Sequence, residues 1–241
     1  MKTIVDLIKE YLEEYPENDY QINQGASLLL IQDDKIMFTL TKTKKWKQKG
    51  DITEIKFSGI GGALEKDESV YECLKRETME EIEIDINDII FPKLFETFIV
   101  DNNRPVNKIE LDIDAKEKTP LYVVRLKLPL REDTDEKDKK YSCLQLIVYI
   151  AKINSNVEVK ISEKENIPGL LIIKGESLEE VLEGKIILDD TEKNDNIEIK
   201  WNKSFDKENI PKKINLIPQF TPLGLRNINL SFNEIKKILE G

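Results

Sequence analysis

Histidine is absent from the 241-residue chain, and cysteine occurs only twice. Without imidazole, the chain has no Ser-His-Asp or Cys-His nucleophile pair and no His-ligated zinc. Cys73 and Cys143 are too few for a disulfide framework and lack the spacing of a zinc site. This cysteine usage predicts a reducing, cytoplasmic location.

Net positive charge is also lacking, since the formal charge is -10. We therefore expect no nucleic acid as a primary partner, because nonspecific binding to its backbone draws affinity from clustered Lys and Arg. No apolar run approaches the length that spans a bilayer, so no membrane partner is expected. Residues 1–15 predict an amphipathic helix and not a signal peptide, because acidic residues interrupt the apolar ones.

Apolar runs and turn signals predict three parts of the chain: an N-terminal helix (1–19), a central domain (20–184) and a C-terminal extension packed on or appended to the core (185–241). Within the domain, a hairpin is expected at residues 26–31 and 35–41, and a charged, solvated insertion near 130–141. Further strands are predicted at 54–58, 94–100, 108–113, 121–128, 142–153 and 170–173. Strands interspersed with a few helices favour an α/β or α+β sandwich.

Residues 59–84 carry the informative motif. Three glycines, at positions 59, 61 and 62, are expected to break regular structure before a helix at about 67–82. On that helix Glu77, Glu80 and Glu81 would share one face, because they are spaced i, i+3 and i+4. Carboxylates crowded in this way repel one another, whereas Mg²⁺ or Mn²⁺ accepts several oxygen ligands. The spacing therefore predicts a divalent metal site, whose positive charge would allow the negatively charged chain to take a small anionic substrate.

The same segment resembles the Nudix box, which is written G-x5-E-x7-R-E-U-x-E-E-x-G-U with U aliphatic. Two positions depart from that pattern. Thr78 replaces an aliphatic residue, and Glu83 stands where the box has glycine, so the chain either adopts a strained left-handed turn there or ends the helix differently. The residues that match are Gly62, Glu68, Arg76, Glu77, Glu80, Glu81 and Ile84.

The resemblance implies a Nudix-like α/β/α sandwich with a mixed sheet. It also implies a Mg²⁺- or Mn²⁺-dependent hydrolase that cleaves a phosphoanhydride bond of a nucleoside diphosphate linked to another moiety. Arg76 is then expected to pair with a box glutamate and not with substrate, and Glu163 or Glu165 is a candidate for a further base. The implied metal site comprises Glu77, Glu80, Glu81 and Gly61, with Gly62 and Glu68 as its structural support.

Several alternatives stay open at this point. A Glu-rich helix is usually a solvated face in a chain that is 35% charged, although the joint Gly, Arg and Glu pattern favours a site. Trp46 is a candidate substrate contact within a lysine-rich loop whose simpler interpretation is a solvated loop. A Nudix-fold sensor that binds a nucleotide without turnover is the rival function. An isopentenyl diphosphate isomerase of the same fold is disfavoured, since that family uses metal-binding histidines. For the extension, a homodimer interface and a substrate lid are both open.

Overall fold

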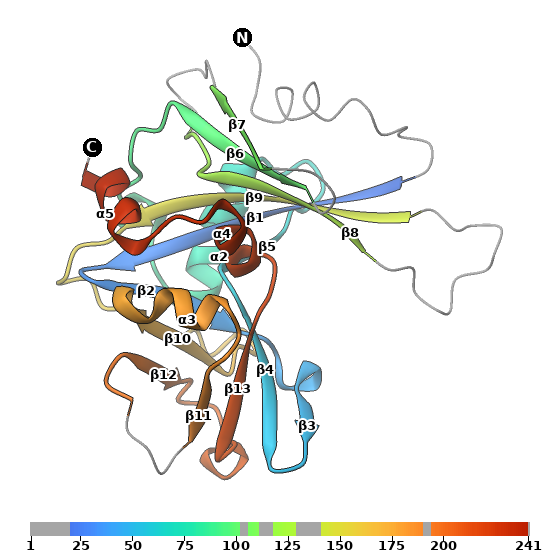
Figure 1. Ribbon diagram of the computed structural model, residues 1–241, viewed down its shortest axis with the longest axis vertical. Coiled ribbons are helices and arrows are strands. Elements are labelled where there is room, and N and C mark those ends of the chain that lie inside the picture. Colours follow the sequence, from blue (N-terminus) through green and yellow to red (C-terminus); the bar gives the residue numbers. More distant parts are fainter. Residues whose placement is uncertain (1–19, 102–105, 111–117, 129–140, 190–193, 241) are drawn as a thin grey trace.

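The computed structural model of the protein describes residues 20–101, 106–110, 118–128, 141–189 and 194–240 (Figure 1). The predicted helix at 1–19 lies outside the described residues, as does nearly all of the charged insertion near 130–141.

Strand β1 (Tyr20–Gln32) organises the mixed sheet. It runs parallel to β9 (Tyr141–Lys152) along almost its whole length and antiparallel to β2 (Lys35–Leu40), so the predicted hairpin is confirmed. The main path through the sheet is β11-β13-β4-β2-β1-β9-β8-β6-β7. Its other members are β4 (Ile52–Ser58), β6 (Glu96–Asp101), β7 (Asn107–Glu110), β8 (Tyr122–Leu128), β11 (Ile187–Asp189) and β13 (Lys213–Pro218).

Four further strands branch from this path. Strand β10 (Gly169–Lys174) lies between β2 and β12 (Ile197–Trp201), and β3 (Lys47–Lys49) pairs with β4. Strand β5 (Ile60–Ala63) pairs with the middle of β1. Short 3-10 turns occur at Thr43–Lys45, Ile86–Asp88, Gly175–Ser177 and Lys207–Asn209.

Both faces of the sheet are buried, and alternation along β1 shows how. Leu29 and Ile31 point into one apolar core, while Leu28 and Leu30 point into the other. Helix α2 (Val70–Ile82) covers the second core. The first core is covered by α3 (Leu178–Leu182), α4 (Thr221–Ile228) and α5 (Phe232–Glu240). The protein is therefore an α+β sandwich with a mixed sheet between helical layers, as predicted.

The C-terminal residues are part of this architecture. Strand β13 runs parallel to β4, from Ile214 opposite Thr53 to Pro218 opposite Phe57. Helix α5 begins after a capping box, in which the Glu234 amide donates to Ser231 Oγ at 3.3 Å and Glu234 Oε2 accepts from the Ser231 amide at 2.8 Å. The division of the chain at residue 184 stays a prediction. None of the helices within the described residues is long and apolar enough to cross a membrane.

The prediction that the glycines break regular structure was wrong for Gly61 and Gly62. Both lie in β5, where Gly61 is opposite Ser27 and Gly62 opposite Ala26. Glycine is needed at position 61 for close approach, because φ is +146° and a Cβ there would come within 2.2 Å of the Ala26 carbonyl oxygen. The neighbouring strand supplies the hydrogen-bonded ladder, which no local sequence signal reveals.

Candidate metal and active site

Helix α2 presents the acidic face, and its ends follow from local sequence. Ser69 is the N-cap: its Oγ accepts from the Glu72 amide at 3.2 Å, and its own amide donates to Glu72 Oε2 at 2.8 Å. The row Val70, Leu74, Thr78 and Ile82 is buried against the sheet, as its i+4 spacing indicates. The glutamates lie on the adjoining side of the helix, where Glu77 and Glu81 are close to β5.

The helix ends at Glu83, whose backbone is left-handed with φ 54° and ψ 36°. This answers the question raised by the missing glycine: the chain keeps the turn that glycine would make and accepts its strain. The Glu83 amide and the Ile84 amide, the latter at 3.3 Å, both donate to the Thr78 carbonyl at the helix end.

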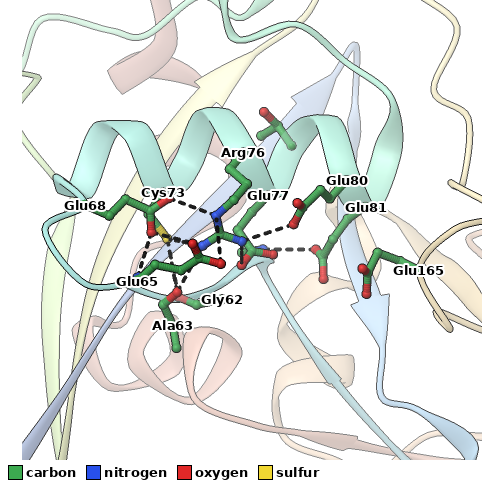
Figure 2. A network of polar contacts seen from close by, with 12 residues as sticks. Gly62, Ala63, Glu65, Glu68, Cys73, Arg76, Glu77, Glu80, Glu81 and Glu165 are labelled. Carbon is green, nitrogen blue, oxygen red and sulfur yellow. Dashed lines mark hydrogen bonds and ion pairs between the residues drawn. The ribbon is translucent and has the colours of Figure 1, made fainter.

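Arg76 holds three of the motif's glutamates together (Figure 2). Its Nε and Nη2 donate to the two carboxylate oxygens of Glu68 at 2.8 and 3.0 Å. Its Nη1 donates to Glu77 Oε1 at 2.7 Å and to Glu80 Oε2 at 3.1 Å. The hydrogen bonds from Arg76 hold the pKa of Glu68 below its ordinary value. Arg76 therefore ties the helix to its preceding loop, the contact expected from the Nudix-box resemblance.

The two glycines of β5 bring backbone close to two carboxylates. The Gly61 amide donates to Glu81 Oε2 at 3.0 Å, and a Cβ at Gly62 would stand 2.1 Å from Glu77 Oε1. Burial raises the pKa of Glu81 well above its ordinary value, and the nearby charge of Glu77 adds to the effect. Burial also raises the pKa of Glu77, although hydrogen bonding to Arg76 opposes this. The pair is thus a confined cluster of like charges, which a cation would stabilise.

A fourth carboxylate, Glu165, comes from the loop before β10 and faces Glu81 (Figure 2). Its charge contributes to the raised pKa of Glu77 and of Glu81, and its Oε2 lies 3.3 Å from Lys42 Nζ. Glu163, the other candidate for a downstream base, is exposed, and no contact within the described part of the chain brings it to this cluster. The structure thus brings one of the two candidates to the site.

Trp46 lies in an aromatic cluster and not against the carboxylates. Its ring centroid is 6.2 Å from that of Trp201 and 5.8 Å from that of Phe205, and its Nε1 donates to the Thr41 carbonyl at 2.7 Å. Its predicted contact with substrate is untested. Cys73 is buried beside the site, and burial raises the pKa of its thiol to about 12, so it stays neutral and is a poor nucleophile.

As the side chains stand, no three Asp, Glu or Cys residues among those described form a group placed to hold a metal ion. The reason lies in their partners: Arg76 holds Glu77 and Glu80, while the Gly61 amide holds Glu81. The donor set nevertheless fits Mg²⁺ or Mn²⁺, because every donor is a carboxylate oxygen. Glu80 is the most exposed of the three, so its side chain is the least confined to its present partner.

Comparison with known proteins identifies the family of the chain. The NUDIX domain family model matches residues 21–141, half of the chain. The protein therefore belongs to the Nudix family. No curated protein sequence is significantly similar to it.

Several solved structures are also similar to this chain, at low sequence identity. A NUDIX-family hydrolase from Clostridium perfringens is 18% identical, with 66% of this chain and 84% of that chain covered and a TM-score of 0.38. An Ap4A hydrolase from C. elegans is 12% identical, with coverages of 65% and 83% and a TM-score of 0.34. A dihydroneopterin triphosphate pyrophosphohydrolase from E. coli is 11% identical, with coverages of 58% and 74% and a TM-score of 0.31. The family assignment rests on the family model.

Proposed function

We propose that the protein hydrolyses a phosphoanhydride bond in a nucleoside diphosphate linked to another moiety, with Mg²⁺ or Mn²⁺ as cofactor. One observation carries the proposal: Glu77, Glu80 and Glu81 project from one side of α2 beside β5, and Glu165 faces them from a distant loop (Figure 2). Carboxylates from separate segments that converge in this way repel one another, and this repulsion destabilises the fold unless a bound cation or a proton offsets the charge. Such clusters are therefore typical of functional sites.

In this proposal Glu77, Glu80 and Glu81 hold the metal, and the backbone at Gly61 belongs to the same site. The bound divalent ion offsets phosphate charge and lowers the pKa of water. Arg76 and Glu68 hold the metal-binding glutamates in place and do not contact substrate. The Arg76 guanidinium donates to glutamates and, at 3.1 Å, to the Ala63 carbonyl. No donor of this arginine is directed at a separate anion in the described contacts.

The reaction needs a group that accepts a proton from the attacking water. We assign this to Glu165, whose side chain is 37% exposed and so reaches both solvent and the carboxylate cluster. Water oxygen forms a bond to phosphorus, the bond from phosphorus to the bridging oxygen breaks, and the leaving phosphate departs with that oxygen. One water proton passes to the Glu165 carboxylate, so atoms and charge balance.

Substitution of single carboxylates tests the proposal. Glu80→Gln and Glu81→Gln are assayed with Mg²⁺ and Mn²⁺ against ADP-ribose, dinucleoside polyphosphates, NADH, CoA and nucleoside triphosphates. Each variant is expected to lose about a hundredfold or more in kcat, because a metal ligand contributes several kcal/mol to the transition state. Chelation with EDTA should abolish turnover in the parent enzyme.

Glu83→Gln is the matched control, since Glu83 ends the same helix but has no contact with the cluster among the described residues. Unchanged turnover in Glu80→Gln and Glu81→Gln would defeat the assignment. Nucleotide binding without turnover of any substrate in the panel would instead support a sensor of the same fold.

A further inference from the structure

A pocket of about 350 Å³ lies beside the carboxylate cluster and is formed by three separate segments of the chain. These are residues 42–44 after β2, residues 165–168 before β10 and residues 204–205 after β12. Two of the three segments lie beyond residues 21–141, where the family model matches. The pocket is therefore built largely by parts of the chain outside the matched region.

Asn202 clamps two walls of the pocket together. This side chain is 4% exposed, and its Nδ2 donates to the carbonyls of Ser162 and Ile167 at 3.0 and 3.1 Å. Its Oδ1 accepts from the amide and the hydroxyl of Ser204 at 3.1 and 2.9 Å, and its own amide donates to the Pro168 carbonyl at 2.8 Å. Every hydrogen-bonding position of the side chain is thus used, which makes the pocket preformed and rigid.

The aromatic wall of the pocket is Phe205. Its ring stacks on Trp201, with centroids 5.4 Å apart and planes 16° apart, and it also contacts Trp46. An aromatic ring supported from behind in this way is a platform on which a planar base can stack.

The cationic side of the pocket consists of Lys42 and Lys44. Lys42 is paired with Glu165 at 3.3 Å, whereas Lys44 has no ion-pair partner within the described residues. Glu165 also faces Glu81, so it lines the pocket and borders the candidate metal site at once (Figure 2). A ligand with a flat ring at Phe205 and phosphates beside the lysines would therefore extend toward the carboxylates.

We propose that this pocket binds the base of the nucleoside phosphate substrate, with the base stacked on Phe205 and the attached phosphate beside Lys42 and Lys44. The volume is within the range of small-molecule sites and holds a base with part of its ribose. This inference rests on the proposed function for its biological meaning, but base binding is measurable without any turnover.

Intrinsic fluorescence reports on this pocket directly, because the chain has only 2 tryptophans, and both contact Phe205. The probes are AMP and ribose 5-phosphate, which differ by the base and have no phosphoanhydride bond to hydrolyse. With Mg²⁺ present, AMP is expected to quench the tryptophans saturably and to bind about tenfold more tightly than ribose 5-phosphate, as stacking of one base predicts. GMP, CMP and UMP then give the base preference.

Two variants separate the contacts. Phe205→Leu should weaken AMP about tenfold and leave ribose 5-phosphate unchanged, because only stacking is lost. Lys44→Gln should weaken both ligands by about tenfold through loss of a charge-assisted phosphate contact. Lys45→Gln is the control, since Lys45 is an exposed neighbour that does not line the pocket.

The pocket assignment is overturned if none of the four nucleotides quenches the tryptophans, if Phe205→Leu binds AMP like the parent, or if Lys45→Gln weakens binding as much as Lys44→Gln. Lys44 is exposed, so its variant keeps the test decisive even if Phe205→Leu unfolds. Metal-dependent turnover combined with absent quenching removes this pocket and keeps the hydrolase. Quenching in an enzyme that turns over nothing removes the hydrolase and keeps the pocket.

Discussion

The ion pair between Arg76 and Glu68 is expected to stabilise the fold more than an ordinary surface pair does. Two parallel hydrogen bonds, 2.8 and 3.0 Å long, join the guanidinium to the carboxylate, and the side chains are only 23% and 11% exposed. Charge-assisted bonds contribute about 1.5–3 kcal/mol each, and screening at partial exposure lowers their sum. We expect a coupling free energy of about 2 kcal/mol from the double-mutant cycle of Arg76→Gln and Glu68→Gln.

A surface pair in the same protein provides the comparison. Lys49 Nζ lies 2.7 Å from Glu54 Oε1, but the lysine side chain is 67% exposed and makes a single contact with that carboxylate. Its coupling, from Lys49→Gln and Glu54→Gln, should be about 0.5 kcal/mol or less. Urea unfolding of both cycles gives the free energies. If the coupling free energy of Arg76 and Glu68 is no larger than that of the surface pair, the claim that the Arg76 guanidinium anchors the preceding loop to α2 is refuted.

Acidification gives a second check on the same pair. Hydrogen bonds from Arg76 lower the pKa of Glu68 from its ordinary value of 4.5, so the unfolded chain takes up a proton there before the folded protein does. The stabilisation is therefore fully present above pH 4.5 and is lost as the pH falls through the lower pKa of the folded state. A coupling free energy between Arg76 and Glu68 that increased as the pH was lowered would contradict this prediction.

Two further substitutions test the backbone of the site. Gly62→Ala would place a methyl group 2.1 Å from Glu77 Oε1, so either this carboxylate or β5 must move. We expect a destabilisation of about 1–3 kcal/mol in urea unfolding and at least a tenfold drop in kcat. Parent values of both quantities would disprove the close approach. Glu83→Gly should raise the free energy of unfolding by about 1 kcal/mol, because a left-handed residue with φ 54° is strained unless it is glycine; an unchanged or lower value would show that this strain is absent.

The helix that carries the glutamates was predictable because its determinants are local. Ser69 and Glu72 form the capping box three residues apart, and the apolar row at i+4 spacing selects the face that packs on the sheet. Once that face is chosen, the helical period places Glu77, Glu80 and Glu81 together on the adjoining side. The motif also pointed to Arg76 as a partner of these glutamates.

Other features depend on contacts between residues far apart in the chain, and no local pattern encodes them. The glycines at 61 and 62 form a strand because β1 lies alongside, and β13, not predicted from sequence, finds its place because β4 offers a parallel partner. The choice between two downstream glutamates was likewise open in the sequence.

The proposed metal ligands of this protein were thus predictable from a short stretch of residues, since helical spacing acts over a few turns. Completion of the proposed site depended on long-range packing. Asn202 pins the loop of Glu165 from forty residues or so away through hydrogen bonds to Ser162 and Ile167. Such contacts form only when distant segments fold against one another, because hydrogen-bond partners carry no periodic signature along the chain.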